Sequence, residues 1–264
     1  MDNLNVKDEV IVSGTSPLNF FRFSRLGSQT IGTGNGGNVN ISTRKLTIDN
    51  GANVGSVLFF GTGSGGDVII KDAESIEVIG EGLSFSSSIN TSTVGQGNAG
   101  IIAINTDRLI VKDGGDIDSA TLSTGNAGEI TINATEFVEL TSLETYGSIR
   151  SAGLANNIFL KFLGVQQNLS EDGGTVIINT PHLNMTGITN ISVANDGLGI
   201  AGNLEINADS INLSDTALLS ASTNSGEGGN IMLKAADLLV LRNNSQISAT
   251  AGGYGNGGSI DIQT

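Results

Sequence analysis

The sequence predicts an all-β fold, a parallel β-helix of eight to nine coils, each built from three short strands and about 28 residues. A phrase of Gly-Gly or Ala-Gly, any residue, an aliphatic residue, any residue and a second aliphatic residue occurs eight times. Aliphatic and polar residues alternate within each interval, as in half-buried strands. Strand-bearing repeats of this length stack into a solenoid with a common core. The second glycines of the phrase are Gly37, Gly66, Gly100, Gly128, Gly174, Gly202, Gly229 and Gly258.

One interval, from residue 201 to residue 228, shows the plan of a coil. Leu204 and Ile206 alternate with polar residues and predict the first strand. After a corner at Ala208-Asp209, a second strand is predicted around residues 211–213. A second corner at Ser214-Asp215 leads to a third strand at residues 218–222, and a Gly-rich corner closes the coil.

An asparagine recurs directly after the second aliphatic residue of the phrase. In register from coil to coil, these side chains are expected to form a ladder of amide hydrogen bonds along the solenoid axis. We interpret the ladder as a device for stability rather than a binding site. Its members are Asn105, Asn133, Asn179 and Asn207.

The phase of the repeat indicates a single solenoid over residues 1–264 whose first and last coils are incomplete. Leu4-Asn5 aligns with Ile132-Asn133, and the strand at residues 260–264 has no partner strands after it. We therefore expect a segment of a longer rod, whose open ends allow end-to-end self-association. Uneven spacing predicts insertions at residues 13–28, 80–88 and 142–172, all at the corner after the second strand. Within the last, residues 158–165 are compatible with a short amphipathic helix.

Insertions at one corner of a solenoid stack on one face, which is often the binding face. The phenylalanines of the first and last insertions are therefore weak candidates for contact with a partner or a glycan. The alternative, which we favour, is that they fold back and cover the flank of the rod. These residues are Phe20, Phe21, Phe23, Phe159 and Phe162.

Charge and composition exclude several functions. Asp and Glu outnumber Lys and Arg by 26 to 12, which gives a net charge of −14. Without a basic stripe, nucleic acid and anionic membrane surfaces are not expected partners. Cysteine is absent, so disulfides and thiolate metal sites are excluded. The sequence contains neither a signal-peptide pattern nor an apolar run long enough to insert into a membrane.

The residues offer little catalytic chemistry, and we expect neither a metal nor another cofactor. His182 is the only histidine, which nearly excludes a serine nucleophile with a histidine base. The best carboxylate cluster is Asp113, Asp116 and Asp118, where Asp116 and Asp118 share an outward face. The neighbouring coils offer no basic partner by our alignment, so we interpret the cluster as a solvated turn.

The repeat phrasing resembles that of cyanobacterial filamentous-haemagglutinin-like exoproteins. The resemblance covers nearly the whole chain and is carried by residues 34–39, 109–117 and 218–223, and by Val10 to Pro17. It implies a right-handed parallel β-helix, secretion through an outer-membrane partner transporter, and a role in adhesion or surface structure. The family's N-terminal signal and secretion domain is not found in this sequence.

The sequence thus predicts a non-catalytic structural or adhesive rod segment of a secreted bacterial surface protein. Its expected partners are the outer-membrane transporter and a cell-surface or glycan receptor. The alternative is a carbohydrate-binding or polysaccharide-degrading β-helix protein. A column of carboxylates with a lysine or arginine on one outer face would favour the enzyme, whereas bare Ser, Thr and Asn faces would favour the rod.

Overall fold

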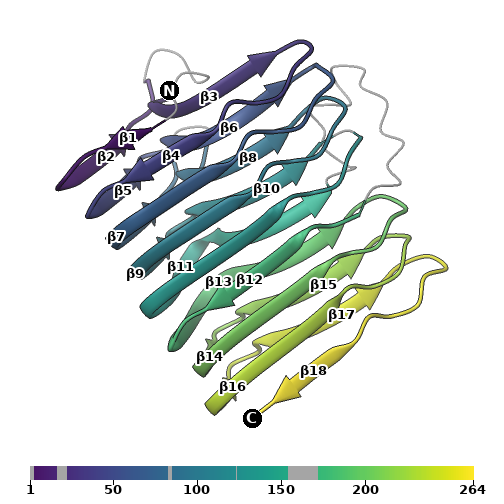
Figure 1. The fold of residues 1–264 in the computed structure, drawn as a ribbon. Helices are drawn as coiled ribbons and strands as arrows, with labels where there is room; N and C mark the ends of the chain where they lie inside the picture. Colours follow the sequence, from purple (N-terminus) through teal and green to yellow (C-terminus); the bar gives the residue numbers. More distant parts are fainter. Residues whose placement is uncertain (1–2, 17–22, 83–84, 123, 154–171) are drawn as a thin grey trace.

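A computed structural model describes residues 3–16, 23–82, 85–122, 124–153 and 172–264 of the chain. It confirms the parallel β-solenoid, with about eight turns stacked along one axis between the N- and C-terminal ends (Figure 1). All pairings between the named strands are parallel, and each strand pairs with the equivalent strands of the coils before and after it. None of the described residues belongs to a helix that could span a membrane.

Each coil contains a first, a second and a third strand; in several coils two of these merge into one bent strand, and in coil 5 all three do. We number the coils 1 to 8 from the N-terminus. Coil 1 contains β1 (Leu4–Asn5), β2 (Glu9–Ser13) and β3 (Arg25–Ile31), and coil 2 contains β4 (Val39–Ser42), β5 (Lys45–Asp49) and β6 (Asn53–Phe59). Coil 3 contains β7 (Val68–Ile79) and β8 (Ser88–Thr93), coil 4 contains β9 (Ile102–Lys112) and β10 (Asp116–Thr121), and coil 5 is β11 (Glu129–Gly153). Coil 6 contains β12 (Thr175–Asn179) and β13 (His182–Asn195), coil 7 contains β14 (Asn203–Ser214) and β15 (Leu218–Thr223), and coil 8 contains β16 (Asn230–Leu241) and β17 (Gln246–Ala251), after which β18 (Ile260–Gln263) begins.

The core consists of aliphatic columns that run through the centre of the coils. Alternation along each strand turns every second side chain inward, and the in-register pairing places equivalent side chains above one another. Every member of the first-strand column is at most 2% exposed from coil 2 to coil 7. The members are Ile41, Ile70, Ile104, Ile132, Ile178 and Ile206.

The predicted asparagine ladder is confirmed. The side-chain amide of Asn133 donates to Oδ1 of Asn105 at 2.9 Å. Asn179 donates to Asn133, and Asn207 donates to Asn179, each at 2.8 Å. The ladder therefore links four successive coils outside the core, in addition to the backbone hydrogen bonds.

The repeated second glycine is required because two backbones meet there. A Cβ atom added to Gly128 would lie 2.0 Å from the carbonyl oxygen of Gly100, and one added to Gly174 would lie 1.9 Å from that of Gly128. The same oxygens accept hydrogen bonds from buried hydroxyls, with Ser119 Oγ 2.9 Å from the oxygen of Gly100. No side chain fits between consecutive coils at this point, which explains why the position is glycine in the repeats from Gly66 to Gly258.

The predicted insertion at residues 142–172 is wrong in its extent and in its placement at one corner. Residues 147–153 form the third strand of coil 5 and pair in register with β10 and β13. The extra residues at the second corner, between the second and third strands, are confined to the irregularity between Ser142 and Gly147. Residues 154–171 follow the third strand, and the helix proposed for residues 158–165 lies outside the described residues. The segments at 13–28 and 80–88 do follow second strands, although β3 already begins at Arg25.

Replacement of Gly128 by alanine should lower the free energy of unfolding by about 3 kcal/mol, because the new methyl group forces coils 4 and 5 apart. Urea denaturation of the purified chain measures this loss. Gly257→Ala is the matched control, since a Cβ there meets no atom within 4 Å. Equal losses in the two variants would contradict the steric explanation.

Candidate functional site

A compact ion-pair cluster lies on the outer face of the third strands of coils 4 and 5. Asp116 and Asp118 lie on β10, and Arg150 lies on β11, directly beside Asp118 in the register. Arg150 Nε is 3.0 Å from Asp118 Oδ1, and Arg150 Nη2 is 3.7 Å from Asp116 Oδ2. Ser148, in register with Asp116, donates its hydroxyl to Asp116 Oδ1. One arginine thus bridges two carboxylates across a coil boundary.

The cluster is largely withdrawn from solvent. The side chains of Asp116, Asp118 and Arg150 are 18%, 11% and 37% exposed. Burial raises the pKa of Asp116 to about 6, and the charge of Asp118 adds to this rise. The charge of Arg150 and the hydrogen bond from Ser148 act in the opposite direction. The pKa of Arg150 is raised, mainly by the charge of Asp118. Asp196, which follows β13 in coil 6, also raises the pKa of Arg150. Burial raises the pKa of Asp196 itself.

These positions correct the interpretation of the acidic cluster as a solvated turn. Asp113 does lie exposed at a corner, with φ +50°. Asp116, in contrast, is half-buried and Asp118 is buried, and both pair with an arginine that our alignment of the repeats missed. Arg150 was assigned to an insertion, although Ser148-Ile149-Arg150-Ser151-Ala152 matches Asp116-Ile117-Asp118-Ser119-Ala120 residue by residue. That internal match is the signal that could have found it.

A second feature is a ridge at the second corner. Three side chains on the loops of coils 3 and 5 are exposed, Phe85 by 40%, Leu143 by 71% and Tyr146 by 73%. Phe23, on the loop of coil 1, packs against Phe85 with ring centroids 5.1 Å apart. We call Phe23, Phe85, Leu143 and Tyr146 the second-corner ridge.

The turns of coils 2, 4 and 6 make room for these loops. A Cβ atom on Gly51 would lie 2.8 Å from Phe85 O, and one on Gly114 would lie 2.7 Å from Glu81 Cγ and 2.8 Å from Thr145 Oγ1. A Cβ on Gly187 would lie 2.0 Å from Ser142 O. All three glycines have φ between +76° and +91°, so tight turns alternate with the longer loops.

Of the candidate phenylalanines, only Phe23 lies among the described residues. It is half-buried, contacts Phe85 and borders a hollow of about 390 Å³, so it both covers the flank and remains accessible. The hollow is lined by Ser13, Gly14, Thr15, Ser16, Phe23 and Ser24. The positions of Phe20, Phe21, Phe159 and Phe162 lie outside the described residues.

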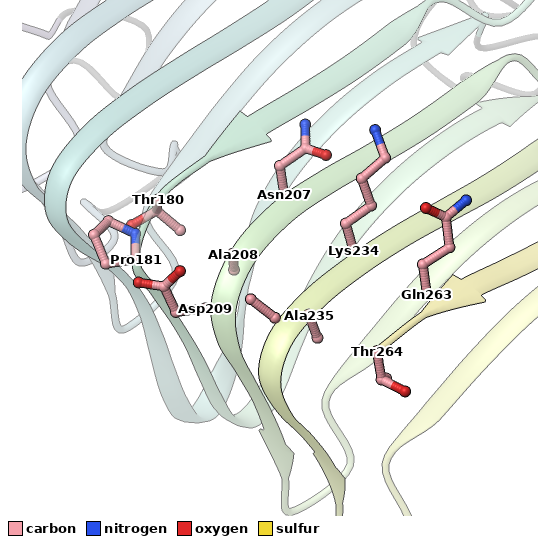
Figure 2. Close-up of a pocket in the computed structure, with 10 residues that line it drawn as sticks. Thr180, Pro181, Asn207, Ala208, Asp209, Lys234, Ala235, Gln263 and Thr264 are labelled. Carbon is pink, nitrogen blue, oxygen red and sulfur yellow. The ribbon is translucent and has the colours of Figure 1, made fainter.

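A larger hollow of about 470 Å³ lies at the first corner, between first and second strands, near the C-terminal end. Asn207, Lys234 and Gln263 follow one another in register, and their side chains stand in a row along its edge (Figure 2). Lys234 Nζ is 3.4 Å from Glu205 Oε1, so this amine already has a partner. The row continues the asparagine ladder with a lysine and a glutamine and brings no nucleophile into the hollow.

Other potential chemistry is sparse. His182 is exposed, and its Nδ1 lies 2.9 Å from Ser210 Oγ. Among the described residues, no three His, Asp or Glu side chains are grouped so that they could hold a metal ion. Comparisons with protein-family models, with curated proteins and with solved structures found no match for this chain. Function is therefore inferred from the two features of the surface.

Replacement of Arg150 by leucine should lower the free energy of unfolding at neutral pH by about 3 kcal/mol, because two poorly solvated carboxylates lose their shared cation. Chemical denaturation measures the loss. Arg44→Leu is the control, since Arg44 also pairs with two carboxylates, Asp8 and Glu74, but its side chain is 56% exposed. The control should lose less than about 1 kcal/mol. A loss in the Arg150 variant no larger than the control's would show that burial adds nothing to the cluster.

Proposed function

We propose that this chain is a non-catalytic, adhesive rod segment of a secreted bacterial surface protein and that the second-corner ridge contacts the receptor. The observation that carries the proposal is the exposure of Phe85, Leu143 and Tyr146 on loops that a regular solenoid holds in place. Large apolar side chains that are gathered on one exposed surface commonly mark an interaction site.

The scaffold supports this role because it fixes the loops before a partner arrives. A Cβ atom on Gly114 would clash with the loops of coils 3 and 5, at Glu81 and Thr145, and one on Gly82 would lie 2.6 Å from Thr15 Cγ2 of coil 1, so no side chain fits between these segments. Binding residues on loops that a rigid framework positions lose little conformational entropy when they bind. The ridge can therefore present several apolar side chains at once.

A glycan receptor suits this surface. The faces of Phe and Tyr rings pack against the apolar C–H face of a sugar ring. The hollow beside Phe23 adds the hydroxyls of Ser13, Thr15, Ser16 and Ser24, and the described residues that line it carry no charge. Uncharged hydroxyls fit a neutral saccharide better than an anionic one.

The resemblance of the repeats to filamentous-haemagglutinin-like exoproteins supports secretion through an outer-membrane partner transporter. The net charge of −14 also suits a rod displayed at high density, because like-charged rods repel one another. Locating the protein in fractionated cells tests both the proposed secretion and the proposed display at the cell surface.

The triple variant Phe85→Ser, Leu143→Ser, Tyr146→Ser should reduce adhesion of the purified, immobilised chain to receptor-bearing cells or neutral glycans at least about tenfold, because the apolar contact area is lost. Bound cells or glycans are counted against concentration. Ile31→Ser combined with Tyr254→Ser is the control, since these side chains are 75% and 107% exposed outside the ridge. An equal loss in the control would remove the ridge from the site, and no adhesion by the unmodified chain would contradict an adhesive function.

The second candidate function, polysaccharide cleavage, is favoured by one observation. Asp116, Asp118 and Arg150 share one outer face, and a carboxyl group with a pKa of about 6 suits a general acid. If this function holds, incubation with polysaccharides releases reducing ends, and Asp116→Asn lowers the rate at least about a hundredfold. Asp237→Asn, an exposed acid on coil 8, should leave the rate unchanged. Release that is equal in all three proteins would come from a contaminant and contradict this candidate.

A further inference from the structure

We propose that Asp116, Asp118, Arg150 and Asp196 form a proton-operated latch that holds coils 4, 5 and 6 together more tightly in mildly acidic than in neutral solution. The latch is independent of what the second-corner ridge binds. It is a property of the third-strand face, and its readout is the local stability of three coils.

Arg150 of coil 5 pairs with two carboxyl groups of coil 4, Asp116 and Asp118, and a third carboxyl group, Asp196 of coil 6, acts on it electrostatically. Arg150 Nε pairs with Asp118 at 3.0 Å, and Nη2 reaches Asp116 at 3.7 Å. Asp196 acts on Arg150 from coil 6, where its backbone N–H donates to Gly153 O at 2.9 Å. With all carboxyl groups ionised, the cluster carries three negative charges and one positive charge.

Among the described residues, the in-register neighbours on the adjacent strands carry no charge that balances this excess. In coil 3, the residues in register with Asp116 and Asp118 are Ser88 and Asn90, which are uncharged. In coil 6, the residues in register with Ser148 and Arg150 are Asn190 and Ser192, also uncharged. Arg150 is thus the only positive group that faces Asp116 from the strands paired with β10 and β11.

A proton on Asp116 removes part of the excess charge, while Arg150 stays paired with Asp118. Because burial raises the pKa of Asp116 to about 6 from its ordinary value of 3.8, the folded chain binds this proton more tightly than the unfolded chain. The stabilising contribution is therefore complete below about pH 4 and is lost as the pH rises through about 6. Asp196, whose pKa is also raised by burial, changes the stability in the same direction.

Hydrogen exchange at about pH 5 and about pH 7.5 tests the latch, with rates corrected for the intrinsic pH dependence of exchange. In the unmodified chain, opening of β10 and of residues 148–153 should increase at least about tenfold between the two pH values. Asp116→Asn should reduce that increase to less than about twofold, because the substituted amide does not titrate. Asp237→Asn, which changes an exposed acid on coil 8, should keep the full increase.

Asp118→Asn gives a second, independent readout. Asp118 raises the pKa of Asp116 and shares Arg150 with it, so its neutralisation should move the midpoint of the exchange change to lower pH. The proposal is overturned if Asp116→Asn retains the pH dependence of the unmodified chain, or if Asp118→Asn moves the midpoint to higher pH.

Discussion

The close approach of successive coils is the constraint on which the structure depends. Parallel backbone pairing sets neighbouring coils about 4.8 Å apart. At the start of each first strand, this leaves room for a carbonyl oxygen and no Cβ, as the contact of Gly128 with Gly100 O shows. The buried hydroxyls of Thr91 and Ser119 satisfy that same oxygen, so the contact costs no unpaired acceptor. Aliphatic columns and the asparagine ladder repeat because the backbone repeats.

The same spacing determines where the solenoid can carry loops. A loop that extends further along the solenoid axis than the spacing between coils must lie over the corner of the neighbouring coil. That corner must then consist of a tight turn without bulky side chains. Gly51, Gly114 and Gly187 provide such corners in coils 2, 4 and 6, next to the loops of coils 3 and 5. The second-corner ridge is thus a consequence of stacking, and it brings side chains from distant parts of the sequence onto one surface.

Charge is arranged by stacking as well. Arg150 lies 32 residues after Asp118 in the sequence. In-register pairing across the boundary between coils 4 and 5 makes the two residues direct neighbours. Partial burial then makes their interaction stronger than that of the exposed pairs around Arg44. Burial raises the pKa of Asp116 in this cluster to about 6, an effect that the polar sequence of the strand does not indicate.

The sequence by itself determined the solenoid, its coil content, the first-strand column and the asparagine ladder, because each follows from a periodicity that local strand chemistry repeats. It placed the acids Asp116 and Asp118 on an outward face but missed Arg150, and it treated residues 142–172 as one insertion. Only the tertiary structure decided these points, since the register of a third strand depends on how many residues the preceding corner absorbs. The few residues between Ser142 and Gly147 set that register, and with it the partner of Asp118. Exposure of Phe85, Leu143 and Tyr146 was likewise decided by which loops overlap, a contact between coils that no single repeat encodes.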